Sequence, residues 1–320
     1  MSDEMLRGAG LGWSVVAVMW LVVMPRDQRG RGWHVGLALA PLVVIGLAAS
    51  APWPDLSQAL TGWLLSGLAV AGVAALAWVA GTVLKNHGVM DVAYPLAGLT
   101  GAITAFVAAG ARPTPAAVLL LSVTALWALR LWWQTWGHNM GEERQPYAAW
   151  RARHGPRWIW WSVFQVHLLQ GVTIWIWCAP FAFAFSAPAS AGLPLAAVGG
   201  LLVWLTGFAL QTRADVELSR FKAHPANRGG LLDTGVWGWV RHPNYLGETV
   251  MWTGYFVFAL AHPWGWITVF APLFNGWFMG WASAAPFKEH HMGRTRPQAW
   301  ADYCARTPRF LPWPRPGGAR

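Results

Sequence analysis

Apolar positions dominate this chain in long, nearly uninterrupted runs. A helix needs roughly 20 apolar residues to cross about 30 Å of hydrocarbon, and nine runs come close to that length. They lie at about 9–24, 33–50, 60–84, 89–109, 115–136, 162–185, 191–212, 244–261 and 263–284. The pattern therefore predicts an all-α, polytopic integral membrane helix bundle of about nine transmembrane helices, within a range of about seven to ten.

Composition agrees with this pattern, because 55% of the residues are hydrophobic and only 11% are charged. A soluble domain usually carries about a quarter of charged residues. The first apolar run is followed by a charged segment at 25–31, so we expect a membrane helix there and no cleaved signal peptide. Cys178 and Cys304 belong to no CxxC pair, which predicts neither a disulfide nor a thiolate metal site.

The basic residues predict the orientation of the bundle. With nine spans, every Lys and Arg except Arg7 and Arg112 falls on one side of the membrane. Because cytoplasmic loops carry the excess of positive charge, we expect an outside N-terminus and a cytoplasmic tail, as in a bacterial inner (cytoplasmic) membrane protein. The net charge of +10 then indicates attraction to anionic membrane lipid, and the absence of a recognisable binding module argues against nucleic acid. The cytoplasmic segments would be 25–32, 85–88, 137–161, 213–243 and 285–320.

Polar residues gather in the predicted cytoplasmic segment 213–243. Asp215 and Lys222 share one helix face if the preceding span continues past the membrane. A carboxylate suits a ribose and a cation suits phosphates, although a solvated helix with exposed ion pairs would show the same pattern. Asn227 and Arg228 then precede two glycines, which let backbone amides approach an anion in a turn.

The next polar run opens a predicted span. Pro243 occupies a first-turn position, and donors from Arg241, His242 and Asn244 gather at the positive end of the helix dipole. Glu248 lies one turn beyond Asn244, already near the membrane, where a carboxylate usually has a function. The alternative is an interfacial cap that forms an ion pair with Arg241.

The order of these motifs resembles the C-terminal domain of the steroid 5-alpha-reductase family, particularly its bacterial members. The resemblance covers about 205–312 and, more loosely, 86–170. It implies two parts, N-terminal membrane helices at 1–84 and a reductase-like membrane domain at 85–320. The motifs that carry it are Gln211-x3-Asp215-x6-Lys222, Gly229-Gly230-Leu231, Arg241-His242-Pro243-Asn244-Tyr245-Leu246-Gly247-Glu248 and Asp302-Tyr303-x2-Arg306-x5-Pro312.

This resemblance implies an NADPH-dependent membrane reductase that saturates a carbon–carbon double bond conjugated to a ketone. The substrate would be a 3-oxo-4-ene steroid or a similar apolar enone taken from the bilayer, and no protein partner is evident. The family residues implied to contact NADPH are Gln211, Asp215, Lys222, Arg241, Asn244, Tyr245 and Glu248. To this set we add Asn227, Arg228, His242, His291, Tyr303 and Arg306 and, from a turn at 142–147 that resembles the family's Arg-containing turn, Arg144 as a phosphate partner.

NADPH would require an unusual pocket, since the chain has no GxGxxG between a strand and a helix. The glycines at 8–12 precede a span and fit no strand–turn–helix context. A Rossmann domain is therefore not predicted. The cofactor would lie among helix ends and inner loops.

The reduction also needs a group that protonates or hydrogen-bonds the ketone oxygen, where charge builds in the transition state. Asp91, at the inner end of the fourth predicted span, is the predicted catalytic acid, and Tyr94 lies on the same side of that helix. The family has a glutamate here, and its tyrosine on the next helix has no counterpart at 129–133. Asp91 could instead be a helix cap.

Two other functions remain open. Integral membrane methyltransferases of the isoprenylcysteine or phospholipid type, which use S-adenosylmethionine, resemble the chain in the run at 241–245 and in the close at 309–312. They usually carry paired glutamates where this chain reads 287–291. A non-enzymatic sterol-binding membrane protein is the other alternative. A metal site is not predicted, because the histidines include a single adjacent pair, His290-His291.

Overall fold

The computed structural model describes residues 3–23 and 32–312, and this part of the chain consists of helices joined by turns. It divides into two compact units, unit 1 (Met1–Pro194 with Ala259–Gly265) and unit 2 (Leu195–Phe258 with Trp266–Arg320). The boundary predicted at residues 84 and 85 falls inside unit 1.

The helices of unit 1 are α1 (Asp3–Val23), α3 (Gly32–Ser50), α4 (Pro54–Val83), α5 (Val89–Ala108), α6 (Pro115–Asn139), α7 (Tyr147–His154), η1 (Gly155–Arg157), α8 (Trp158–Ser162), the π-helix η2 (Val163–Leu168), α9 (Leu169–Trp177) and α10 (Ala179–Phe185). Unit 2 contains α11 (Leu195–Ala223), η3 (Pro225–Asn227), η4 (Gly235–Gly238), α12 (Pro243–Ala259), η5 (Gly265–Val269), α13 (Phe270–Trp277), η6 (Phe278–Ala282), α14 (Ala284–Thr295) and α15 (Pro297–Arg306), with the first residue of η5 and the last residue of α12 assigned to unit 1.

Six helical segments of the described chain are long and apolar enough to cross a membrane. They support the prediction of an all-helical integral membrane protein, whereas the nine spans and the orientation stay predictions. The predicted runs at 33–50, 244–261 and 263–284 form α3, α12 and the broken series from η5 to η6. The six segments are Glu4–Val23, Pro54–Val83, Val89–Ala108, Pro115–Asn139, Tyr147–Phe185 and Leu195–Ala223.

Helices extend further into the polar segments than the apolar runs indicate. The segment 137–161 contains the end of α6 and all of α7, and α11 continues to Ala223, well past the apolar run at 191–212. The helix therefore continues past the apolar run, and Asp215 and Lys222 lie on one helix as predicted. Apolar runs mark only the lipid-facing part of a helix, so amphipathic continuations go undetected.

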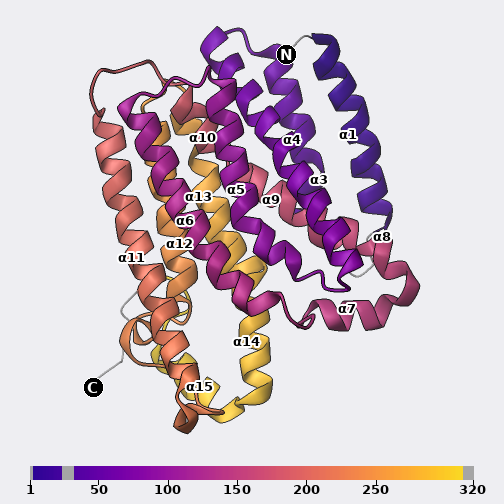
Figure 1. The fold of residues 1–320 in the computed structure, drawn as a ribbon, viewed down its shortest axis with the longest axis vertical. Coiled ribbons are helices and arrows are strands. Elements are labelled where there is room, and N and C mark those ends of the chain that lie inside the picture. Colours follow the sequence, from indigo (N-terminus) through magenta and orange to yellow (C-terminus); the bar gives the residue numbers. More distant parts are fainter. Residues whose placement is uncertain (1–2, 24–31, 313–320) are drawn as a thin grey trace. The chain divides into compact units, whose positions relative to one another are not determined.

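In unit 1, α4 packs along α5 and α5 packs along α6, while α9 and α10 contact both α4 and α5 (Figure 1). Small residues allow the close approach. A Cβ added to Gly101 would lie 2.9 Å from the Cys178 sulfur. Trp63 and Trp175 also join α4 to α9, because each indole N–H donates to the other's backbone carbonyl, at 2.8 and 2.7 Å.

In unit 2, α11 and α12 meet backbone to backbone through glycines. A Cβ added to Gly207 would lie 2.5 Å from the Met251 nitrogen, and one added to Gly247 would lie 2.6 Å from the Gln211 nitrogen. Such contacts admit only glycine, the residue that lets helices pack at their closest in membranes. Gly247 belongs to the motif at 241–248, so this residue fixes how the motif's helix meets α11.

Candidate functional site

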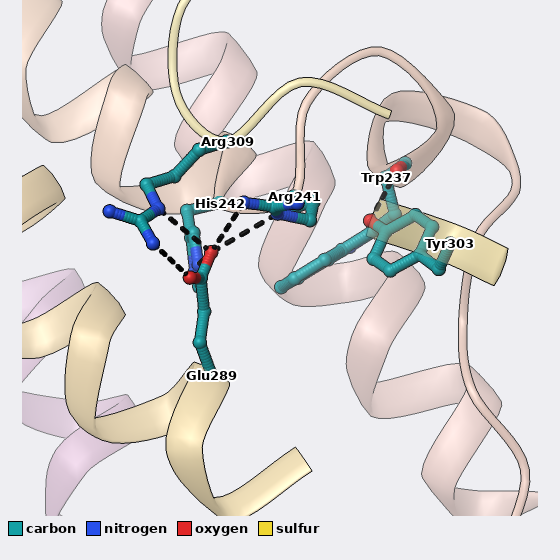
Figure 2. Close-up of polar contacts among 6 residues, drawn as sticks. All are labelled: Trp237, Arg241, His242, Glu289, Tyr303 and Arg309. Atoms are coloured by element: carbon teal, nitrogen blue, oxygen red, sulfur yellow. Dashed lines mark hydrogen bonds and ion pairs between the residues drawn. The ribbon is translucent and has the colours of Figure 1, made fainter. Parts of the chain in front are cut away.

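The most concentrated polar cluster of unit 2 centres on the carboxylate of Glu289, which extends from α14 (Figure 2). Arg241 donates from Nε to Oε1 at 3.1 Å, and its Nη2 forms an ion pair with the same oxygen at 3.0 Å. His242 Nε2 donates to the same oxygen at 3.1 Å. Arg309 donates from Nη2 to Oε2 at 2.6 Å and from Nε to Oε1 at 3.2 Å. Two residues of the predicted cofactor set are thus held by a carboxylate outside that set.

This cluster carries a surplus of positive charge. Burial opposes ionisation of Glu289, but hydrogen bonds from His242 and Arg309 and the charges of both arginines lower its pKa to about 2. Burial, reinforced by the two arginines, lowers the pKa of His242 despite the neighbouring carboxylate. At neutral pH one carboxylate therefore faces two guanidinium groups, so these ionised side chains together carry a net positive charge.

The tail of the chain is tied to the segment before α12. The Tyr303 hydroxyl donates to the Trp237 carbonyl at 2.5 Å (Figure 2), and the Arg241 backbone N–H donates to the Pro308 carbonyl at 2.9 Å. The Arg241 guanidinium also lies over the Trp300 ring, 5.5 Å from its centroid. These contacts hold the start of the motif at 241–248 against the tail that carries the motif at 302–312.

A second polar contact of unit 2 lies between α11 and α12. Gln211 Nε2 donates to Glu248 Oε2 at 2.5 Å, and Trp252 Nε1 donates to Oε1 at 3.0 Å. Glu248 is 2% exposed, and Asp215, one turn beyond Gln211 on α11, is also buried. The structure therefore brings Gln211 and Glu248 together. Arg241 forms an ion pair with Glu289.

The remaining predicted cofactor residues of unit 2 surround these contacts less closely. The Tyr245 ring stacks on His242, with centroids 5.5 Å apart, and Asn244 is half-buried. The Asn227 amide donates to the Phe221 carbonyl at 3.0 Å, which stabilises its own turn. Four members of the set are solvent-exposed, namely Lys222, Arg228, His291 and Arg306, the last of which pairs with Asp233.

In unit 1, the predicted acid Asp91 lies in the first turn of α5. The hydroxyl of Tyr147, the first residue of α7, donates to Asp91 Oδ1 at 2.7 Å. Gln170 Nε2 donates to that hydroxyl at 3.2 Å. Three helices thus contribute one side chain each to a hydrogen-bonded chain around the predicted acid.

Tyr94 has a different environment. Its ring contacts Trp127 and Trp177 edge-on, with centroids 5.9 and 6.0 Å away. Arg144, predicted as a phosphate partner, is exposed, and its Nη1 lies 3.1 Å from His138 Nε2. The roles of Tyr94 and Arg144 stay predictions.

A second carboxylate of unit 1, Glu143, precedes α7. Its Oε1 accepts the His87 backbone N–H at 2.8 Å, and Arg151 donates to both of its oxygens at 2.6 and 2.9 Å. Burial opposes ionisation of Glu143, but these bonds and the Arg151 charge lower its pKa. The His87 Nδ1 lies 2.9 Å from His167 Nε2, and burial together with the Arg151 charge lowers the pKa of His87 to about 4.

Sequence reasoning missed Glu289, Arg309, Tyr147 and Gln170. A signal was available for Gln170, because a polar side chain inside an apolar run usually has a partner. Glu289 gave no such signal, since it stands in a charged tail where many side chains are merely solvated. Tyr147 follows a charged turn and reads as a loop residue until α7 is known.

The comparisons with known proteins cover most of the chain after its first helices. The family described as "Protein of unknown function (DUF1295)" matches residues 77–307. The Delta(14)-sterol reductase LBR of Gallus gallus is 37% identical over 97 residues, which are 30% of this chain and 14% of that protein. The chain thus matches about a seventh of that relative's length. No solved structure matches the chain.

Proposed function

The chain belongs to the DUF1295 family of proteins of unknown function, and we propose that it is a membrane reductase that uses NADPH to saturate a carbon–carbon double bond conjugated to a ketone. The likeness to a protein named as a Delta(14)-sterol reductase carries this proposal. The apolar helices support a substrate drawn from the bilayer, a 3-oxo-4-ene steroid or a similar enone.

The residues of unit 2 fit a dinucleotide phosphate. Arg241 and Arg309 face a single carboxylate, so their cluster retains the positive charge that phosphates require. The buried carboxylates of Asp215 and Glu248 suit the hydroxyl and amide groups of such a ligand. When bound, NADPH would supply the hydride. The residues of unit 2 that would hold it are Gln211, Asp215, Lys222, Asn227, Arg228, Arg241, His242, Asn244, Tyr245, Glu248, His291, Tyr303 and Arg306.

The Asp91–Tyr147 pair of unit 1 fits the proton-donating part of the reaction. Negative charge develops on the ketone oxygen during reduction, and a preorganised donor stabilises it. Asp91 would donate to that oxygen, and its bond to Tyr147 would fix the carboxyl group for this role. Tyr94, three residues along α5, is the predicted assisting residue.

Thermal unfolding with added ligands tests the proposal against its alternatives. A ligand present at 100 times its Kd stabilises a protein by about 2.7 kcal/mol. We expect NADPH to raise the Tm of the detergent-purified protein and S-adenosylmethionine to leave it unchanged. The opposite result would overturn the reductase assignment and favour the methyltransferase, which the run at 241–245 also resembles. A response to neither ligand but to a sterol would favour the non-enzymatic alternative.

A further inference from the structure

The residue that fixes the Asp91–Tyr147 bond can be traced through unit 1. Tyr147 stands at the start of α7, an eight-residue helix whose sequence is charged and only partly buried. So short a helix has little intrinsic stability, and its position must be set by contacts with its neighbours. Ring contacts of Trp150 and His154 with Trp161 hold its far end, and two polar links meet at Glu143, in the turn before α7.

The two links of Glu143 bracket the Asp91–Tyr147 bond. His87, whose backbone N–H donates to Glu143, lies four residues before Asp91. Arg151, which pairs with Glu143 through two hydrogen bonds, lies four residues after Tyr147 on α7. Tyr147 and Arg151 lie on one face of α7, and His87 lies in the turn before α5, so Glu143 joins α7 to the turn that leads into the helix of Asp91.

The Glu143–Arg151 pair has the features of a rigid contact. The Glu143 side chain is 8% exposed, and a bidentate guanidinium–carboxylate pair has one preferred geometry. The Arg151 guanidinium also lies 5.8 Å from the centre of the Trp158 ring, which in turn contacts His87 edge-on. Arg151 is therefore held from two sides.

From these contacts we infer that Glu143 is a positioning residue, which holds α7 so that the Tyr147 hydroxyl meets Asp91. Its effect on turnover rests on the proposed function, whereas its effect on the Tyr147–Asp91 bond does not. The loop before α5 has an independent tie, because the Asn86 amide donates to the Asn139 and Gly141 carbonyls at 2.7 and 3.3 Å. Removing the Glu143 charge therefore leaves that loop attached.

Fluorine NMR of protein labelled with fluorotyrosine tests this inference without an activity assay. The chain has five tyrosines, and Tyr147→Phe identifies the Tyr147 signal. In the parent protein, Asp91→Asn should shift that signal, because the hydroxyl's acceptor changes. In Glu143→Gln the Tyr147 signal should move, and adding Asp91→Asn should no longer shift it. If the signal stays in place in Glu143→Gln and still responds to Asp91→Asn, the inference is wrong.

Glu217→Gln is the matched control. Glu217 also accepts from one arginine and one backbone N–H, those of Arg213 and Val236, but it belongs to unit 2. Its replacement should leave the Tyr147 signal unchanged. If Glu143→Gln fails to fold, Arg151→Lys gives the same test, since lysine keeps the charge and loses the bidentate geometry. A Tyr147 signal unmoved in Arg151→Lys would equally contradict the inference.

Turnover distinguishes the inference from the proposed function. A misplaced catalytic group costs up to about 10²-fold in rate, so Glu143→Gln should lower kcat by at most that factor and leave the KM for NADPH unchanged. Glu143→Asp should recover part of the loss. If the Tyr147 signal moves as expected while even the parent protein oxidises no NADPH, the reductase assignment fails and the positioning role of Glu143 stands.

Discussion

Glu143 in unit 1 and Glu289 in unit 2 are both ionised carboxylates that hold side chains from other elements, but their surroundings differ in charge. Glu143 faces one arginine and a backbone N–H, so its group is neutral overall. Glu289 faces two arginines and a neutral histidine, so its group keeps one positive charge. A balanced group suits the fixing of geometry, whereas an unbalanced group suits the recognition of an anion.

The largest expected effect concerns the carboxylate of unit 2. Glu289→Ala would leave the buried guanidinium of Arg241 without its counter-charge, and breaking a buried pair in this way costs about 3–5 kcal/mol. We expect a correspondingly lower free energy of unfolding, measured by thermal or denaturant unfolding in detergent. Arg213→Ala, which removes the exposed partner of the Arg213–Glu217 pair, should cost about 1 kcal/mol or less. Equal losses of unfolding free energy in both variants would contradict the assignment of the Glu289 pair as buried and the Arg213 pair as exposed.

The pH dependence of unfolding checks the same carboxylate. The folded-state pKa of Glu289 is lowered from 4.5 to about 2, so the unfolded state binds more protons between these values. Its contribution to stability is therefore complete above about pH 4.5 and is lost as the pH falls toward 2. The Tm of Glu289→Gln should fall less steeply than the parental Tm across that window. Parallel curves would show that Glu289 does not titrate with folding.

The next effect concerns the hydrogen-bonded acid of unit 1. Losing one preorganised donor typically costs about 10²- to 10³-fold in turnover, roughly 2.7–4 kcal/mol of transition-state stabilisation. Asp91→Ala should show this loss in single-turnover NADPH oxidation with a 3-oxo-4-ene steroid, and its affinity for NADPH should change little. Asp91→Glu, which restores the acid usual in the resembling family, should retain activity. A folded Asp91→Ala variant with the parental rate would make Asp91 a helix cap only.

The smallest effect concerns an exposed residue of the predicted cofactor set. Arg306 pairs with Asp233 at the surface, where an ion pair contributes about 0–1 kcal/mol to stability. Arg306→Ala should therefore leave the Tm almost unchanged but weaken NADPH binding, more so at low salt, where charge–charge attraction is least screened. Asp233→Asn is the control, since it breaks the same pair and should leave NADPH binding intact. Equal binding by parent and Arg306→Ala would remove Arg306 from the set.

The sequence predicted the helical fold well, because lipid-facing helices must be continuously apolar. It also placed Gln211 and Glu248 in one candidate site, through a resemblance whose motifs include Gly247. It did not predict α7, a charged helix held by a few polar contacts that no hydrophobic period reveals. The sequence also did not predict that Glu289 is the shared acceptor of Arg241, His242 and Arg309. These three donors come from two segments that are far apart in the sequence and meet only in the folded protein.

The glycine contact between α11 and α12 determines how far the Gln211–Glu248 bond can adapt. A contact between backbones has no rotamers to exchange, so the helices cannot slide past each other without breaking main-chain packing. The separation of the two backbone positions that carry the amide and the carboxylate is thus a property of the scaffold, stiff against changes in bilayer thickness or temperature. We expect this backbone separation to stay the same whether or not a ligand occupies the protein, so that only the two side chains adapt.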